Sequence, residues 1–289
     1  NIKKIQQKFE ELIDKENPDA ILFNDFPATL WSQKFQKIPN LCYTHDIHML
    51  YTDTYINNLS TITRWLWRIL RIFVRKQDKK KWKTFDQIIC NSQYISDYIM
   101  KTYKTKTDVI YVGTDTNVFQ SPKNTVKEKA ILTMGDLKVR RADFLLKACK
   151  KLAQKRNDFK IWIVGTKKDE EDVLKQLAKD LGIEKNVKFF GVINKDRELA
   201  KIYSESLVLT HLVKESAFGL TAGESMSCQT PVIAWKPSGL EELIENGETG
   251  YNIEQDNEDV LITCIEKFLD HPDLSYQMGK KARKRVQKF

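Results

Sequence analysis

The sequence predicts an α/β protein of two domains, each built around a parallel β-sheet. Three observations indicate this fold class. Short, almost continuously apolar runs recur along the 289 residues, as expected of strands that are covered on both faces. Amphipathic helical patterns, such as 143–155 and 170–181, separate most of these runs. A polar segment without apolar periodicity, 121–129, reads as a linker and divides the chain into domains 1–120 and 121–289.

The predicted strands follow one another with helical patterns between most of them. In order along the chain they are 20–23, 40–44, 87–90, 108–112, 130–133, 160–164, 187–190, 207–210 and 231–234. Ligands of open α/β sheets bind beyond the carboxyl ends of the strands. The loops that follow these strands are therefore the expected place of a functional site.

The composition is that of a soluble globular protein, with 41% hydrophobic and 30% charged residues. The charge balance, 48 − 39 = +9, suits an anionic partner: a phosphate-bearing ligand, a nucleic acid or an acidic membrane surface. The five cysteines are scattered and have no zinc-binding spacing, which predicts reduced thiols, no metal site and a cytoplasmic protein. No apolar run reaches the roughly 20 residues of a membrane-spanning helix.

The most informative segment is 214–234, a loop and helix between two predicted strands. Gly219 allows a backbone to approach a ligand closely. Thr221 is the expected N-cap of the helix, whose first amides favour a phosphate. Glu224, expected in the first turn, could accept hydrogen bonds from vicinal hydroxyls such as those of a ribose. It could equally do no more than complement the dipole of its own helix.

This segment carries Phe-Gly-Leu at 218–220, Glu224, Met-Ser-Cys at 226–228 and Thr-Pro-Val-Ile-Ala at 230–234. It resembles the signature of the family-4 retaining glycosyltransferases of GT-B fold, the glycosyltransferases group 1. Further segments that resemble the family follow in the right order: 43–46, 86–92, 109–119, 163–165, 190–192, 238–242 and 247–250. The resemblance extends from about residue 18 to the end of the chain.

The resemblance implies two Rossmann-like domains that face a cleft. It implies transfer of a sugar from a UDP- or GDP-linked donor to a glycan or lipid-linked acceptor, with retention of configuration and without a cofactor or metal. The segment 1–120 would be a partial acceptor-side domain, and 121–289 would bind the donor. The family's glycine-rich first strand and its final helix have no counterpart here, so the chain is expected to be truncated at both ends.

The resemblance also implies the residues of the site. On the catalytic side these are His45, Glu215 and Ser216. The implied donor-binding residues are Gly135, Lys138, Arg140, Arg141, Gly165, Val192, Phe218, Gly219, Leu220, Thr221 and Glu224. Apart from the resemblance, an isolated histidine such as His45 at a strand end is usually a structural or capping imidazole.

Two departures from the family pattern concern catalysis. The first glutamate of the Glu-x7-Glu pattern is Ser216 here, and Glu215 lies one position away. The arginine expected after Gly135 is Asp136, a like charge for a diphosphate. These departures favour an alternative, a catalytically impaired GT-B protein that binds a nucleotide or a partner subunit.

The family's lysine and glycine in the same loop are replaced by Arg140 and Arg141. Because arginine matches phosphate oxygens well, we expect Arg140, Arg141 and Lys138 to restore the phosphate-binding charge.

The segment 63–83 predicts a basic and aromatic helix. At about 100° per residue, Arg64, Arg68, Arg71 and Arg75 fall within one narrow arc, and apolar residues cover nearly all the rest. Such a helix is either a core helix with a solvated arginine stripe or lies in the interface of an anionic membrane. The second interpretation would place the protein at the cytoplasmic face of a membrane. A nucleic-acid partner is not expected, because the chain has no RNP, KH or zinc-finger pattern.

Overall fold

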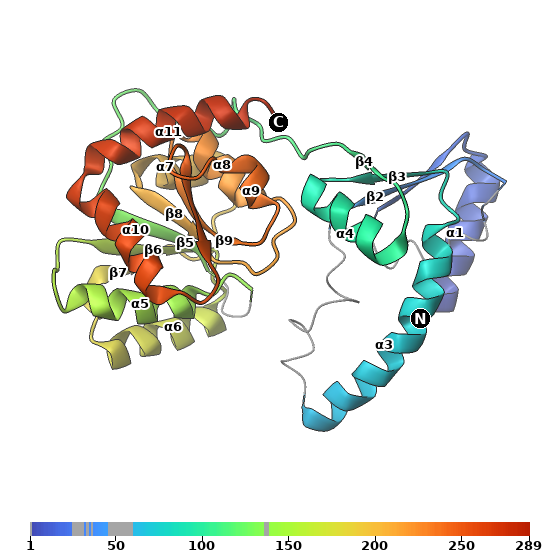
Figure 1. Ribbon diagram of the computed structural model, residues 1–289, viewed down its shortest axis with the longest axis horizontal. Coiled ribbons are helices and arrows are strands. Elements are labelled where there is room, and N and C mark those ends of the chain that lie inside the picture. The colour runs from blue at the N-terminus through green and yellow to red at the C-terminus, as the bar shows by residue number, and fades with distance from the viewer. Residues whose placement is uncertain (1, 25–31, 33–34, 36, 46–59, 136–138) are drawn as a thin grey trace. The chain divides into compact units, whose positions relative to one another are not determined.

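The computed structural model contains two α/β units, residues 1–111 and 112–289 (Figure 1). It describes residues 2–24, 32, 35, 37–45, 60–135 and 139–289. Two residues discussed above, Asp136 and Lys138, lie outside this description. Within it, no helix is long and apolar enough to cross a membrane.

The first unit is built on a parallel sheet in the order β1-β2-β3-β4. Its elements are α1 (Ile2–Glu16), β1 (Ile21–Asn24), β2 (Asn40–Thr44), α3 (Thr61–Trp82), β3 (Gln87–Cys90), α4 (Gln93–Tyr103) and β4 (Asp108–Val109). Ser92 follows β3 and accepts a hydrogen bond from the Ile95 amide, so it caps α4. The expected strands are all present, although the one predicted at 108–112 pairs over two residues only.

The core of the first unit is aromatic. Phe23 of β1 is 2% exposed and contacts the rings of Phe9 in α1 and Phe85 before β3. These contacts attach α1 to the sheet, because Phe9 lies on the face of α1 that turns toward β1.

The second unit is larger and carries the sheet β10-β9-β8-β5-β6-β7, with all strands parallel. Its strands are β5 (Ala130–Met134), β6 (Lys160–Val164), β7 (Val187–Phe189), β8 (Val208–His211), β9 (Val232–Lys236) and β10 (Gly250–Glu254). Its helices are α5 (Ala142–Ala153), α6 (Lys168–Leu181), the 3-10 turn η3 (Glu184–Asn186), α7 (Asp196–Glu205), α8 (Leu220–Ser227), α9 (Leu240–Leu243), α10 (Glu258–Asp270) and α11 (Pro272–Val286).

The strand order reverses between β5 and β8. The chain leaves β5 toward β6 and β7 and then returns through α7 to place β8 on the other side of β5. This is the order of a Rossmann domain, in which ligands bind beyond the carboxyl ends of the strands at the reversal. The topology thus places the loops after β5 and β8 side by side.

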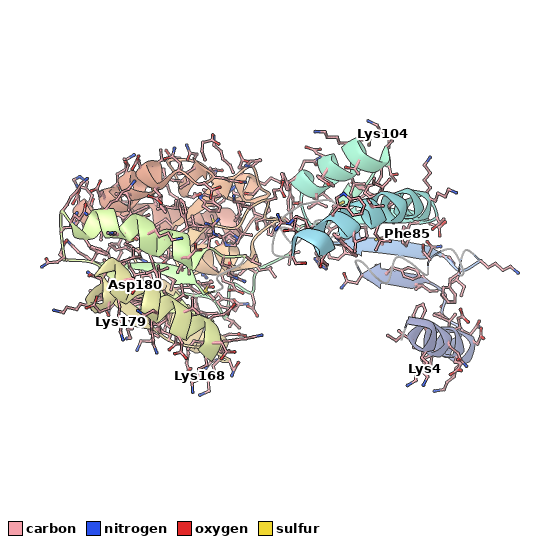
Figure 2. The ribbon with its side chains drawn as sticks, turned by 90° about the horizontal axis from the view of Figure 1, so that it is seen from below. Lys4, Phe85, Lys104, Lys168, Lys179 and Asp180 are labelled. Atoms are coloured by element: carbon pink, nitrogen blue, oxygen red, sulfur yellow. The ribbon has the colours of Figure 1, made fainter. Side chains whose placement is uncertain are left out.

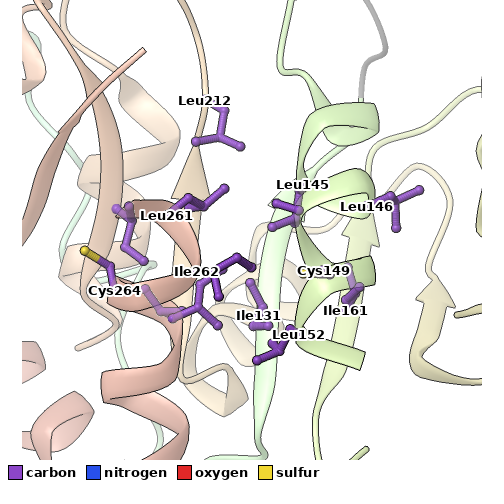
Figure 3. Packing of buried hydrophobic residues seen from close by; sticks show 14 of the residues in the cluster. Ile131, Leu145, Leu146, Cys149, Leu152, Ile161, Leu212, Leu261, Ile262 and Cys264 are labelled. Carbon is purple, nitrogen blue, oxygen red and sulfur yellow. The ribbon is translucent and has the colours of Figure 1, made fainter. Parts of the chain in front are cut away.

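Helices cover both faces of this sheet (Figure 1). Helices α6 and α10 both contact α5, and α7 and α11 both contact α8. Figure 3 shows Leu145 and Leu152 of α5 close to Ile131 of β5 and Ile262 of α10, all of them buried. The charged side chains of α6, such as Lys168 and Lys179, lie on the outer surface (Figure 2). The continuous apolar runs are therefore explained by a sheet that is buried on both faces.

The boundary between the two structural units lies between residues 111 and 112. The polar segment 121–129 had predicted a boundary between residues 120 and 121. The residues between these positions pack on the second unit. Phe119 is 8% exposed and contacts the ring of Tyr203, and Ser227 Oγ donates to the Phe119 carbonyl at 2.5 Å. The polar segment is a surface stretch inside the second unit, because polarity reports exposure to solvent rather than membership of a domain.

Candidate functional site

The implied donor-binding residues that the structure describes gather at one edge of the second sheet. Gly135 follows β5, Gly165 follows β6, Val192 comes shortly after β7, and 218–224 follow β8. Since the strands are parallel, their carboxyl ends share this edge. His45 belongs to the first unit, where it follows β2 and its ring meets Tyr43 edge-on, with 4.5 Å between the ring centroids.

Gly135, Gly165 and Gly191 follow the ends of neighbouring strands, and their backbone hydrogen bonds extend the sheet pairing beyond those ends. The Gly135 amide donates to the Val164 carbonyl at 2.5 Å, and the Gly165 amide donates to the Gly191 carbonyl at 2.7 Å. A Cβ at Gly135 would lie 2.2 Å from Cγ2 of Thr166. Gly165 has φ +90, a conformation that favours glycine. Gly135 is buried against Thr166, whereas Gly165 is exposed and Gly191 half-buried, so a flat ligand could approach the backbone at the latter two glycines.

Helix α8 begins differently from the prediction. Its N-cap is Gly219, in the left-handed region with φ +85, and Thr221 lies inside the first turn. The prediction of Thr221 as N-cap is wrong because its hydroxyl bonds to the ring of His211 at 3.1 Å and does not cap the helix. A Cβ at Gly219 would lie 2.6 Å from Cδ2 of Leu240, so only glycine fits here. The first amides of α8 point out of the helix toward the β5–β8 reversal.

Glu224 is the fifth residue of α8, and the first turn of that helix holds no acidic residue. The interpretation that it only complements the helix dipole therefore fails, because the dipole acts mainly within the first turn. The hydroxyl of Tyr203 in α7 donates to Glu224 Oε2 at 2.9 Å. Burial raises the pKa of Glu224, and burial together with the Glu224 charge raises the pKa of Tyr203 well above its usual value. The bond fixes one carboxylate oxygen and leaves Oε1 without a partner among the described residues.

The two arginines after β5 have different surroundings. Arg140 Nη1 lies 3.5 Å from the Thr221 hydroxyl, at the start of α8. Arg141 pairs with Asp143 at 3.1 Å and with Asp256 at 3.5 Å. Its guanidinium also lies over the rings of two aromatic residues, Phe144 and Trp235. Both carboxylates are shared with lysines, Asp143 with Lys147 at 3.3 Å and Asp256 with Lys214 at 2.5 Å, so the cluster keeps a net positive charge although Arg141 itself is paired.

Arg141 also occupies an unusual backbone position. It has φ +54 and is the N-cap of α5. A side chain costs about 1–2 kcal/mol in the left-handed region. That cost gives a physical reason for the glycine in the family pattern that this position resembles.

The loop between β8 and α8 is anchored at Ser216. Its carbonyl accepts from the Gly239 amide at 2.8 Å, and its hydroxyl lies 3.3 Å from Nε2 of His211. The preceding residue, Glu215, has φ +54, so the backbone turns sharply just before Ser216.

Two residues of this site were missed by sequence reasoning. His211 is the last residue of β8, at the edge of the sheet where a ligand is expected, and this position could have marked it as a site residue. Tyr203 gave no signal, because it lies on α7 at a distance of 21 residues from Glu224. Burial and the positive charge of Arg140 lower the pKa of His211 to about 3, so its imidazole is neutral at physiological pH.

The described residues contain no cluster of three or more potential metal ligands among His, Cys, Asp and Glu. All five cysteines lie in the described part of the chain, where they are buried and form no disulfide.

Family models match both halves of the chain. Residues 114–285 match the family described as "Glycosyl transferases group 1", and residues 4–118 match "Glycosyltransferase Family 4". The two matches meet at 114–118, close to the division between the structural units.

Three curated proteins illustrate the sequence relatives. An uncharacterized glycosyltransferase of Haemophilus influenzae is 26% identical over 281 residues, which are 96% of this chain and 74% of the relative. The N-acetyl-alpha-D-glucosaminyl L-malate synthase of Bacillus anthracis is 30% identical over 55% of this chain and 41% of its own length. The D-inositol 3-phosphate glycosyltransferase of Rhodococcus jostii is 25% identical over 71% of this chain and 49% of its own length. The chain thus spans half or less of the latter two relatives.

Solved structures show the fold. Sucrose-phosphate synthase from Thermosynechococcus elongatus matches with a TM-score of 0.81 and 21% identity, over 99% of this chain and 73% of that one. Anabaena Alr3699/HepE in complex with UDP matches with a TM-score of 0.77 and 20% identity, over 99% and 77%. The fold is GT-B, with two Rossmann-like domains.

Proposed function

The chain belongs to the glycosyl transferases group 1 family, and we propose that it transfers a sugar from a UDP- or GDP-linked donor to a glycan or lipid-linked acceptor with retention of configuration. The observation that carries this proposal is the carboxylate of Glu224. It lies at the β5–β8 reversal, where a Rossmann domain binds its ligand, and Tyr203 leaves one of its oxygens available.

The donor would lie along the edge of the second sheet. The first amides of α8 and the guanidinium of Arg140 suit the diphosphate, since both present positive charge and N–H donors. Glu224 Oε1 would accept hydrogen bonds from the ribose hydroxyls. The backbone at Gly165 and Gly191, next to the 57% exposed Val192, would support the base.

In the reaction the leaving diphosphate gains negative charge as the bond to the sugar breaks. Donors that are already fixed in place stabilise such a charge by several kcal/mol. Arg140 and the α8 amides would provide this stabilisation. The family resemblance would place Glu215, Ser216 and His45 on the side of the transferred sugar, and 1–111 would supply the acceptor side.

A second candidate is a GT-B protein that binds a nucleotide or a partner subunit without efficient catalysis. Two observations favour it: the guanidinium of Arg141 is held by Asp143 and Asp256, and a serine stands at position 216. In this case the donor site would bind nucleotide but would turn over slowly.

The melting temperature of the chain with UDP, GDP, ADP and their sugars tests the proposal. A ligand at about 100 times its Kd stabilises by roughly 2.7 kcal/mol, a shift of several degrees. We expect one nucleotide to stabilise the parent but not Glu224→Ala. The matched control is Glu184→Ala, an exposed residue of η3 at the amino end of β7. The donor site would be contradicted if a nucleotide stabilised Glu224→Ala as much as Glu184→Ala. It would also be contradicted if no nucleotide stabilised the parent and the control. The active enzyme would release free nucleotide from the nucleotide sugar that stabilises it, and the impaired protein would release little.

The membrane interpretation of 63–83 gains support from helix α3. Five large apolar side chains of this helix are exposed: Trp65 (63%), Leu66 (56%), Ile69 (39%), Leu70 (49%) and Ile72 (65%). At about 100° per residue they share one side of the helix. Together with the basic sequence of this helix, they suit an interface of anionic lipid, and we propose that surface as a partner. The five buried cysteines, none of them in a described disulfide, suit the cytoplasmic face that we propose.

A further inference from the structure

His211 connects the two ends of the loop that precedes α8. It is the last residue of β8 and is 7% exposed. Its Nδ1 lies 3.1 Å from the hydroxyl of Thr221 in α8, and its Nε2 lies 3.3 Å from the hydroxyl of Ser216 in the loop. One imidazole thus bridges a serine and a threonine that both adjoin the proposed diphosphate position.

Arg140 sets the direction of this chain of hydrogen bonds. A guanidinium can only donate, so the Thr221 hydroxyl oxygen accepts from Arg140 Nη1 at 3.5 Å. The hydroxyl has one hydrogen of its own. The oxygen has a second lone pair and could also accept from a hydrogen on Nδ1 of His211, which lies 3.1 Å away. A hydroxyl that accepts from a cation is, however, a stronger donor, so we infer that Thr221 donates to Nδ1 and that Nδ1 is the acceptor.

The protonation state of His211 determines which way the hydrogen bond to Ser216 runs. The ring is buried, Arg140 is the charged group that faces it, and its pKa of about 3 means that it has a single ring hydrogen. With Nδ1 accepting, that hydrogen lies on Nε2 and is donated to Ser216 Oγ. The Ser216 hydrogen is then left over, because no second contact of this hydroxyl is made within the described residues.

We propose that the chain Arg140 to Thr221 to His211 to Ser216 fixes Ser216 as a hydrogen-bond donor toward an oxygen of the sugar diphosphate, with His211 as its positioning residue. This inference rests on the proposed function, because the ligand is the nucleotide sugar. A glutamate at 216, as in the family pattern, would present an acceptor in its carboxylate form. This chain instead presents an oriented hydroxyl, so it selects a ligand atom of the opposite kind.

The tautomer of His211 is the first test and needs no ligand. Nitrogen-15 labelling of the histidines in the full chain, followed by a long-range proton–nitrogen spectrum, distinguishes Nε2–H from Nδ1–H. The spectrum of His211→Gln identifies the signal, since the chain has four histidines. We expect Nε2–H. A predominant Nδ1–H form, or a cationic ring at neutral pH, would overturn the inference.

Binding of UDP-glucose and GDP-mannose, measured by calorimetry, is the second test. We expect Ser216→Ala and His211→Phe each to weaken the better of the two probes by about tenfold, the effect of one lost hydrogen bond. The double variant should lose no more than either single variant, because both act through one contact. His211→Gln should retain most of the affinity, since its amide reaches the position of Nε2.

Additive losses, or an unaffected Ser216→Ala, would refute the positioning role. The melting temperature of each variant guards against a general loss of structure, and His211→Gln remains informative where His211→Phe folds poorly. If the parent binds neither these probes nor any nucleotide, the proposed function itself fails. A binding parent with Nδ1–H refutes only the present inference.

Discussion

The contact between Tyr203 and Glu224 shows how a single buried hydroxyl can prepare a carboxylate for binding. Tyr203 is fully buried in α7, and its only described acceptors are Glu224 Oε2 at 2.9 Å and the more distant Met134 sulfur at 3.7 Å. Because the other carboxylate oxygen has no described partner, the tyrosine orients the group without satisfying it. Orientation of this kind reduces the entropy that ligand binding must otherwise overcome.

Replacement of Tyr203 by phenylalanine tests this orientation. We expect Tyr203→Phe to lower the free energy of unfolding by about 1–2 kcal/mol, because a partly buried carboxylate loses its donor. The affinity for the stabilising nucleotide should fall severalfold. Urea unfolding and calorimetric titration measure the two effects. Tyr251→Phe is the matched control, since Tyr251 contacts Phe268 through its ring and has no described bond at its hydroxyl. Equal behaviour of the two variants would show that the bond does not position Glu224.

His211 gives the stability of the protein a defined pH dependence. Its pKa is about 3 in the folded protein and 6.5 in the unfolded chain, so the unfolded state binds more protons between these values. Stability should therefore fall as the pH decreases from 6.5 toward 3, by at most about 1.4 kcal/mol per pH unit. Glu224 acts in the opposite direction, because a raised carboxyl pKa favours the folded state as the pH falls.

The difference between parent and His211→Gln isolates the histidine. Urea unfolding from pH 4.5 to 7 should show a steeper decline for the parent than for the variant. Parallel curves would mean that the folded protein accepts a proton at His211 as readily as the unfolded chain does.

The site illustrates what a sequence can reveal at the scale of residues. Glu224 and Gly219 were predictable because a family pattern and a local conformational requirement mark them. Tyr203 was not predictable, since its contact depends on how α7 packs against α8. Thr221 was assigned as an N-cap because threonine prefers that position, but its hydroxyl bonds instead to the ring of His211 at the end of the preceding strand β8.

At the scale of elements, strands and helices followed from periodicity, and their ends did not. The predicted strand 187–190 became β7 at Val187–Phe189, although the Phe190 amide still donates to the Ile163 carbonyl of β6 at 3.0 Å. The helix at 63–83 was predicted as either a core helix or a membrane helix. Five of its large apolar side chains are exposed, which a core position would have buried, and the interfacial position remains a proposal.

The exposed side of α3 leads to a direct prediction on lipid binding. The chain should sediment with phosphatidylglycerol vesicles at low salt and not with phosphatidylcholine vesicles. Trp65→Gln with Ile72→Gln should reduce the partition coefficient by tenfold or more, because two large apolar side chains no longer enter the interface. Val126→Gln is the control, since Val126 is 76% exposed but lies in the second unit. Absence of binding to the anionic vesicles, or an equal loss in the control, would contradict the proposal.

At the scale of the whole molecule, the chain passes from one unit to the other through 112–120, and this segment belongs to the second unit by its contacts. Arg283 of α11 donates to the carbonyls of Thr116 at 3.1 Å, Phe119 at 3.2 Å and Ser227 at 2.5 Å. One guanidinium thus joins the crossing segment, the end of α8 and the last helix of the chain. Sequence reasoning could not assign the segment, because two of these three contacts span more than 160 residues.

Arg283→Ala should release this segment. Three carbonyl groups would lose a charged donor, and we expect the free energy of unfolding to fall by about 2–3 kcal/mol. Limited proteolysis of the parent should cut before Phe119, near the 111/112 division, whereas the variant should also be cut within 114–123. Lys284→Ala is the control, because Lys284 is the exposed neighbour on the same helix and has no described partner. The same fragments from Arg283→Ala and Lys284→Ala would show that Arg283 does not hold the crossing segment. The contact between the rings of Phe119 and Tyr203 would then hold it on the second unit and set the boundary.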